Sequence, residues 1–189
     1  MTDITFTDEQ KQVILQIARE SGRNEITRTA QKKYTAEGEK YGLTFVPGGV
    51  FVTYKINGQL RGCIGCFCPG KPFYQLIQEY AIHACNDSRF KRMKVDQFDN
   101  TTISVSCLSI PVGITDPLHQ VIAGKHGITV EYEYYRGTYL PQVATEQGWN
   151  TEEFCTSCAY HKAGIPRTVD VFNDKEVSWQ TYTATVVSE

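Results

Sequence analysis

Apolar side chains recur at helical spacing in the N-terminal part of the chain. One apolar face consists of Val13, Ile14, Ile17 and Ala18. Thr7, which precedes two acidic residues, is a typical N-terminal cap for this helix, and Ser21-Gly22 is expected to end it. A second, more polar helix is predicted from Asn24 through Thr35. A third is predicted from Pro72 to about Asn86, where the apolar positions again have helical spacing.

Alternating apolar and polar residues predict a hairpin after these first helices. The segment GVFVTYKI, residues 49–56, alternates β-branched and aromatic side chains, stops at Asn57-Gly58 and resumes as QLRGCIG at residues 59–65. Asn-Gly is a preferred pair for a two-residue hairpin turn, so this is the strongest hairpin signal in the chain.

The turn would also fix the register of the hairpin. Tyr54 would then face Arg61, and Arg61 and Cys63 would share one face of the second strand. Two residues along a strand are about 7 Å apart, so the guanidinium could favour the Cys63 thiolate. Gly62 and Gly65 have no side chain and would let another backbone or a ligand approach closely.

The C-terminal half combines further strands with short helices. The pattern predicts a strand at residues 101–110, a short helix opened by Asp116-Pro117, and a hairpin around Arg136-Gly137. It then predicts a helix that Asn150 caps and Gly164 ends, followed by a strand from Trp179 to Val187. Strands outnumber those of a repeating βαβ pattern. The expected fold class is therefore α+β, with a mostly antiparallel sheet and flanking helices.

Length and composition are those of one ordinary globular domain over residues 1–189. The chain is 41% hydrophobic and 12% aromatic, and it has no apolar run long enough to cross a membrane. Its start, MTDITFTDEQ, lacks the features of a secretory signal. We therefore expect the protein to be located in the cytoplasm, or also in the nucleus if its source is a eukaryote. Seven cysteines, an odd number, suit a compartment where thiols stay reduced. A net charge of −2 argues against general nucleic-acid binding.

The segment LRGCIG, residues 60–65, resembles the signature hexapeptide of the AMMECR family, named after the chromosomal region of Alport syndrome, midface hypoplasia and elliptocytosis. Further resemblances follow in order: DSRF at 87–90, ISVSCLS at 103–109, KHGI at 125–128, TYLPQVATEQGW at 138–149 and KAGI at 162–165. The resemblance implies an α+β fold with a larger and a smaller lobe, and with the hexapeptide facing the groove between them. It also implies an association with radical-SAM or Memo-type proteins, but no particular activity or cofactor.

Two cysteines, Cys66 and Cys68, lie just outside the hexapeptide, where the family pattern does not require cysteine. Together with Cys63, Cys155 and Cys158 they have the spacing of paired thiolate ligands for zinc or iron. However, Cys155 and Cys158 fall one turn apart on a predicted helix, where free cysteines usually pack as small core residues. We therefore expect no metal site, and the sequence identifies no cofactor.

Cys63 is a candidate nucleophile, with Arg61 as a stabilising charge and His126 as a candidate base. His126 is the one histidine within a family-matching segment. The alternatives are a buried small residue for Cys63 and a capping or surface histidine for His126. Asp87 and Arg89 could orient a ligand, or they could simply pair with each other.

A third hypothesis is recognition without chemistry. The segment RFKRMK, residues 89–94, places four cations beside Phe90 and Met93. This arrangement suits a phosphate or an acidic partner, although a solvated basic loop is the simpler interpretation. An exposed Trp149 would also favour a partner-binding surface.

The candidate site is therefore a groove whose floor consists of Tyr54, Arg61, Gly62 and Cys63. Further ligand-binding candidates are Gly65, Asp87 and Arg89. We predict an enzyme that processes a small anionic or nucleotide-like ligand with Cys63 as its nucleophile. The alternative is a non-catalytic adaptor that uses the same groove.

Overall fold

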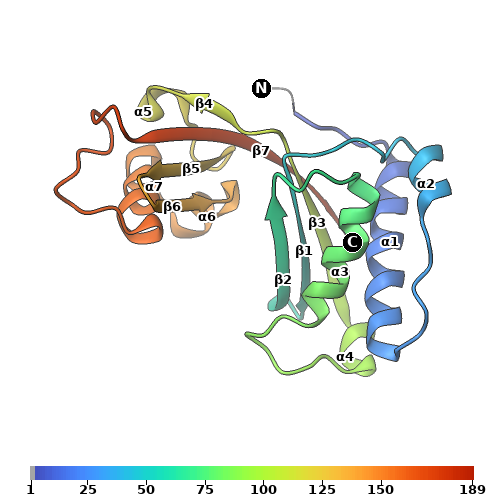
Figure 1. Ribbon diagram of the computed structural model, residues 1–189. Helices are drawn as coiled ribbons and strands as arrows, with labels where there is room; N and C mark the ends of the chain where they lie inside the picture. The colour runs from blue at the N-terminus through green and yellow to red at the C-terminus, as the bar shows by residue number, and fades with distance from the viewer. Residues whose placement is uncertain (1–2) are drawn as a thin grey trace. The chain divides into compact units, whose positions relative to one another are not determined.

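Helices and strands occur in both of the units that the chain forms (Figure 1). The structure, a computed structural model, describes residues 3–189. The N-terminal unit consists of residues 4–108 together with residues 185–189. The C-terminal unit consists of residue 3 and residues 109–184.

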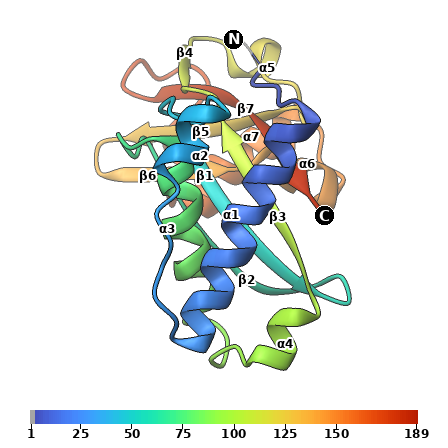
Figure 2. The same ribbon diagram turned by 90° about the vertical axis from the view of Figure 1, so that its right-hand side faces the viewer.

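The N-terminal unit is a sheet with two long helices on one of its faces (Figure 2). Its elements are α1 (Asp8–Thr27), α2 (Thr35–Lys40), β1 (Gly49–Ile56), β2 (Gln59–Phe67), α3 (Phe73–Cys85), α4 (Val95–Asp99) and β3 (Thr101–Leu108). The last residues of β7 (Ser178–Ser188) complete this sheet, whose strand order is β2-β1-β3-β7. β2 therefore forms an edge of the sheet.

The core of this unit lies between the sheet and the helices α1 and α3. It contains Ile14 and Ile17 of α1, Leu76 and Ile77 of α3, Val50 and Val52 of β1, and Ile103 and Val105 of β3. The helical residues recur every three or four positions and the strand residues every second position, so each element buries one face. Each fully buried aliphatic side chain of this kind stabilises the fold by about 1.5–3 kcal/mol.

Helix α1 begins as predicted, but it does not end at Ser21-Gly22. Thr7 caps its start in a reciprocal pair of hydrogen bonds with Gln10. A Cβ atom at Gly22 would lie 2.4 Å from the hydroxyl oxygen of Tyr54. Gly22 therefore serves close packing of the helix rather than its termination. The predicted helix from Asn24 to Thr35 was wrong, since α1 absorbs its beginning and residues 29–34 are not helical.

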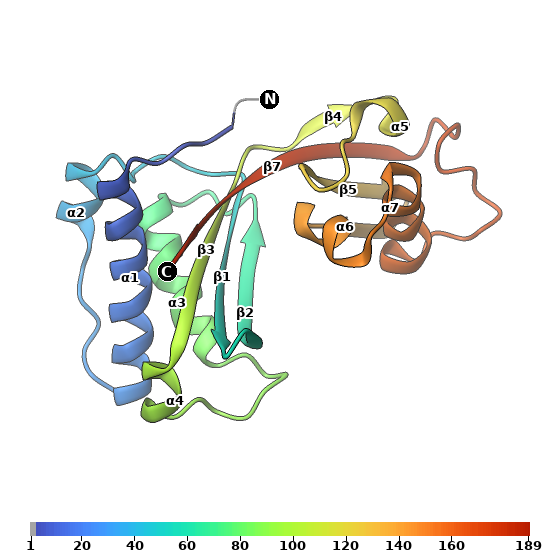
Figure 3. The same ribbon diagram turned by 180° about the vertical axis from the view of Figure 1, so that it is seen from behind.

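The C-terminal unit is a smaller sheet with short helices (Figure 3). Its elements are β4 (Val112–Ile114), α5 (Pro117–Gln120), β5 (His126–Tyr132), β6 (Tyr135–Tyr139), α6 (Pro141–Gln147), α7 (Thr151–Ser157), the π-helix η1 (Cys158–Ala163) and the first part of β7. β5 pairs with β6 and β7, and β4 pairs with β7. Its core includes Ile128, Val130, Phe154, Cys155, Cys158 and Trp179.

The predicted helix ends of this unit are confirmed, whereas the predicted position of its hairpin turn is wrong. Asp116 and Asn150 cap α5 and α7, and Gly164, with φ of 78°, follows the end of η1. The turn of the β5–β6 hairpin lies between Tyr132 and Tyr135, not at Arg136-Gly137. A Cβ atom at Gly137 would lie 2.7 Å from the backbone nitrogen of Ala163, so this glycine makes room for η1.

The strand pairs whose register is resolved are antiparallel, which confirms the α+β class with a mostly antiparallel sheet. Within residues 3–189, every helix is too short or too polar to span a membrane.

Candidate functional site

The β1–β2 hairpin has the predicted turn but not the predicted register. Asn57 and Gly58 have φ of 49° and 77°, as a turn with two left-handed residues requires. After two regular pairs a β-bulge follows, and Tyr54 pairs with Gly62 instead of Arg61. The extra residue on β2 shifts every later position by one, so the expected shared face of Arg61 and Cys63 was wrong.

Tyr54 belongs to the core and not to the floor of a groove. Its side chain is completely buried. Its hydroxyl lies within hydrogen-bond distance of the carbonyl oxygens of Ala18 (3.3 Å) and Ala81 (3.1 Å), which can accept a hydrogen bond from it. Burial raises the pKa of this phenol well above its ordinary value. Tyr54 thus joins α1 and α3 to the sheet and is not part of the candidate site.

The two glycines of the 60–65 segment allow close packing within the unit. A Cβ atom at Gly62 would lie 2.1 Å from the carbonyl oxygen of Ala84, at the end of α3. A Cβ atom at Gly65 would lie 2.1 Å from the carbonyl oxygen of Val50 and 2.4 Å from the ring of Phe51. The close approach expected at both positions is therefore made by the protein itself.

Cys63 lies on the face of the sheet opposite to α1 and α3. It pairs with Thr53, whose next neighbour across the sheet is Ser104, so three small polar side chains form a row over β2, β1 and β3. The Thr53 hydroxyl donates a hydrogen bond to the half-buried Cys63 thiol at 3.1 Å. Sequence reasoning missed Thr53 because the bulge moved it opposite Cys63, and no local pattern signals that shift.

Asp87 and Arg89 hold the outer edge of β2 at Cys63. The Cys63 backbone N–H donates to Asp87 Oδ2 at 2.9 Å, and its carbonyl oxygen accepts from Arg89 Nη2 at 3.0 Å. Arg89 also donates to both oxygens of Asp87, at 3.0 Å from Nε and 2.7 Å from Nη2. Two side chains from the segment after α3 thus replace the partner strand that β2 lacks at this point.

The Asp87–Arg89 pair is buried on one side and exposed on the other. The side chain of Asp87 is 2% exposed, whereas that of Arg89 is 57% exposed. Hydrogen bonds from Arg89 and from the Cys63 N–H lower the pKa of Asp87 to about 2, against the effect of burial. The pKa of Arg89 is raised, chiefly by Asp87 and with a contribution from Cys63. The pairing considered from the sequence is real, and it also places a cation at Cys63.

Arg61, the bulge residue, contacts the segment between α3 and α4. Its Nη2 donates to the carbonyl oxygen of Lys91 and, at 3.5 Å, to Gln97 Oε1. Its guanidinium carbon lies 5.8 Å from the ring centre of Phe90. Arg61 therefore fixes this loop, whereas Arg89 is the arginine that donates a hydrogen bond to the backbone carbonyl of Cys63.

His126 lies in the C-terminal unit, at the start of β5. It is 9% exposed, and its Nδ1 accepts a hydrogen bond from the backbone N–H of Ile122 at 3.1 Å. Burial, together with Lys125, lowers its pKa. The neutral ring therefore carries its proton on Nε2, and Nδ1 is already engaged. A base role for His126 stays a prediction.

The remaining cysteines differ in exposure. Cys155 and Cys158 are completely buried in the core of the C-terminal unit, and burial raises the pKa of Cys155 to about 12. In the N-terminal unit Cys66 is half-buried and Cys68 is exposed. Among residues 3–189, no three histidine, cysteine or acidic side chains are grouped so that they could hold a metal ion.

Trp149 is half-buried and packs against Tyr139, with ring centres 6.0 Å apart. The Lys162 ammonium lies 6.0 Å from the same Tyr139 ring. Trp149 is thus largely a packing residue of the C-terminal unit, and it gives no strong sign of a partner-binding surface.

Comparison with known proteins places these features in a family. The model of the AMMECR1 family matches residues 15–187. A protein of Methanothermobacter thermautotrophicus is 40% identical over 148 residues, which are 75% of this chain and 75% of that protein. Protein PH0010 of Pyrococcus horikoshii is 36% identical over 151 residues, 75% of this chain and 72% of the relative. The crystal structure of PH0010 has a TM-score of 0.81 and 29% identity, covering 96% of this chain and 92% of that one.

Proposed function

This chain belongs to the AMMECR1 family, and from that premise we propose that it is an enzyme acting on a small anionic ligand at Cys63. In this proposal the Cys63 thiol is the nucleophile and Arg89 attracts the anion. Asp87 positions both, and the LRGCIG segment supplies the edge of the sheet on which they lie.

The observation that carries the proposal is the position of Arg89. Its guanidinium is bonded to the backbone of Cys63, yet more than half of its side chain is exposed. This places an accessible guanidinium, paired with Asp87, beside the residue that carries the half-buried thiol, where it can contact an anionic ligand. Arg61, which the sequence favoured for this role, is engaged with the loop instead.

The proposed step is attack by sulfur on an electrophilic centre of the ligand. The sulfur forms the new bond, and the leaving group departs with the electrons of the bond that breaks. The Thr53 hydroxyl donates its hydrogen bond to the sulfur. It can therefore stabilise negative charge on the sulfur, but it does not accept the thiol proton. The thiol proton must therefore leave to water, to the ligand, or to another base.

The alternative function is a non-catalytic adaptor, in which Asp87 and Arg89 only close the edge of β2. An adaptor needs no reactive thiol, and alkylation therefore separates the two functions.

The test compares alkylation of native protein by iodoacetate and by iodoacetamide, with each cysteine followed by mass spectrometry. The exposed Cys68 serves as the internal reference, because it lies on the same segment without the Arg89 contact. The proposal expects a higher iodoacetate-to-iodoacetamide rate ratio at Cys63 than at Cys68. Arg89→Gln should lower this ratio at Cys63, whereas Arg92→Gln, a matched change on the same loop, should not.

Thr53→Val should slow both reagents at Cys63 and leave Cys68 unchanged. A Cys63 thiol that reacts only in unfolded protein would contradict the proposal. So would an equal rate ratio at the two cysteines.

A further inference from the structure

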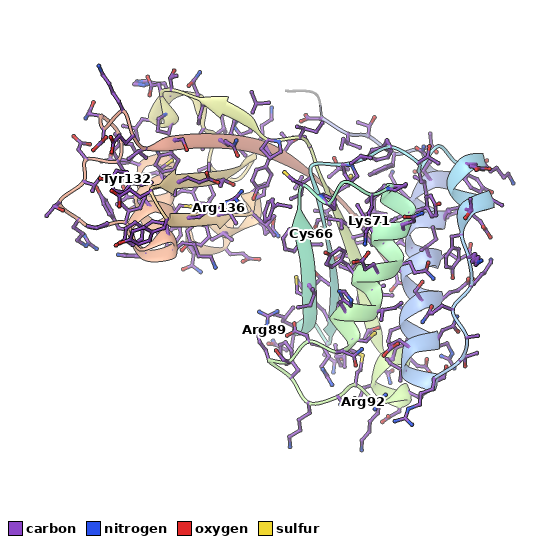
Figure 4. The ribbon with its side chains drawn as sticks, in the orientation of Figure 1. Cys66, Lys71, Arg89, Arg92, Tyr132 and Arg136 are labelled. Atoms are coloured by element: carbon purple, nitrogen blue, oxygen red, sulfur yellow. The ribbon has the colours of Figure 1, made fainter. Side chains whose placement is uncertain are left out.

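The loop between α3 and α4 carries cationic side chains that differ in what they contact. We define the basic loop as residues 87–94, which connect the end of α3 to α4. Figure 4 shows Arg89 and Arg92 at separate points along it. Some of the charges near it are engaged with the protein, whereas others form no ion pair within residues 3–189.

The engaged groups fix the shape of the loop. Asp87 and Met93 are buried, at 5% and 2% exposure, and anchor its two ends. Between them the ring of Phe90 lies near two guanidinium groups, 5.8 Å from that of Arg61 and 5.7 Å from that of Arg89. Arg61 also donates to the backbone of Lys91. The loop is thus held at its ends and at its centre.

The free charges project from this fixed backbone. The side chains of Lys91, Arg92 and Lys94 are exposed, and among residues 3–189 no acidic side chain forms an ion pair with any of them. Lys32 and Lys71 of this unit have acidic partners, whereas the exposed Lys33 and Lys55 have none among residues 3–189. Three unpaired cations within four residues, in a chain of net charge −2, are a concentrated positive patch.

We propose that the basic loop binds an acidic segment of a partner protein, with Lys91, Arg92 and Lys94 contacting a run of aspartate or glutamate side chains. Four extended residues span at most about 10 Å from the first to the last, so the patch matches a few successive carboxylates. A fixed loop loses little conformational entropy when it binds, which favours recognition. This binding does not require the Cys63 chemistry.

The loop suits an acidic peptide better than a nucleic acid. Single-strand binding sites combine cations with free aromatic faces on which bases stack. Phe90, the aromatic residue of this loop, already lies against Arg61 and Arg89. The short patch also lacks the extended track of cations that would follow a phosphate backbone.

The experiment measures fluorescence anisotropy of a labelled oligoglutamate peptide with the full chain, at low and at physiological salt. An oligoglutamine peptide of equal length and a single-stranded oligothymidylate are the comparison probes. The patch variant is Lys91→Glu, Arg92→Glu and Lys94→Glu combined. The matched control combines Lys33→Glu, Lys55→Glu and Lys175→Glu, exposed lysines elsewhere that change the net charge equally.

The expected result is salt-dependent oligoglutamate binding that the patch variant weakens about tenfold, while the control stays within about twofold. The single change Arg92→Glu should weaken binding by about threefold, which keeps the test valid if the triple variant unfolds. Equal losses in the patch variant and the control would overturn the proposal, since net charge alone would then explain binding. Equal binding of oligoglutamine, tighter binding of oligothymidylate, or no binding would also overturn it.

Discussion

The buried carboxylate of Asp87 accepts a hydrogen bond from the backbone N–H of Cys63 at 2.9 Å. An edge strand normally leaves such groups to solvent or to another chain. Here the N–H and the carbonyl of one residue are both satisfied by side chains, those of Asp87 and Arg89. The DSRF segment therefore has a definite structural task at Cys63, whatever chemistry the thiol performs.

Replacing Asp87 should destabilise the N-terminal unit. Asp87→Asn replaces one of the two acceptor oxygens by an NH2 group. That group would then face a donor, the N–H of Cys63 or the guanidinium of Arg89, and the hydrogen bond would be lost. We expect the free energy of unfolding in urea to fall by about 1–3 kcal/mol, the usual effect of unpairing a buried polar group. Asp96→Asn, an exposed change nine residues further along the chain, should cost less than about 0.5 kcal/mol. Equal effects of the two changes would contradict the role of Asp87.

Acid should remove the same contribution. The pKa of Asp87 is about 2 in the folded protein, below the ordinary 3.8, so folding favours the ionised carboxylate. Its contribution is complete above pH 4 to 5 and is lost as the pH falls towards 2. It amounts to at most about 2 kcal/mol, because solvent screens the exposed Arg89. Urea denaturation between pH 5 and 2 should show this loss, and Asp87→Asn should flatten the curve. An unchanged slope in the variant would count against the assignment.

The close approach at Gly62 should make this position intolerant of any side chain. A Cβ atom there would lie 2.1 Å from a backbone oxygen of α3, so Gly62→Ala must displace the helix or the bulge. We expect a loss of at least about 2 kcal/mol, measured as a lower midpoint of thermal unfolding. Gly113→Ala is the matched control, because an added Cβ in β4 would meet nothing within 4 Å. A tolerated Gly62→Ala would mean that α3 is not held against β2.

Signals carried by a few adjacent residues were readable from the sequence. The Asn57-Gly58 turn, the caps at Thr7, Asp116 and Asn150, and the strand of β7 all follow from such signals. Each depends on backbone preference or on simple periodicity, which neighbouring residues determine.

Features set by tertiary packing were not readable. Gly22 was predicted to end a helix and Gly137 to form a turn, but each makes room for an element far away in the sequence. The bulge beside Gly62 likewise has no local signal in the sequence, and because of it Thr53 and Arg89, not Arg61, contact Cys63. The pairing of Asp87 with Arg89 was foreseen as an alternative, but its attachment to β2 required the structure.

His126 provides the last prediction, because its ring already has a partner. Nδ1 accepts from the Ile122 N–H, and burial lowers the pKa of the ring below 6.5. The folded protein therefore resists protonation that the unfolded chain accepts. Stability of the C-terminal unit should be complete above pH 6.5 and should fall as the pH drops below that value. An NMR titration should find the lowered pKa and the Nε2–H tautomer at neutral pH.

His126→Gln removes this titration, while its side-chain oxygen can still accept from Ile122. The loss of stability between pH 6.5 and 5 should then be smaller than in the unmodified chain, as measured by urea denaturation at each pH. Alkylation of Cys63 by iodoacetamide should keep its rate and its pH profile, since the proposed site takes its charges from Asp87 and Arg89. A rate at Cys63 that falls severalfold in His126→Gln, with Cys68 unaffected, would contradict this prediction.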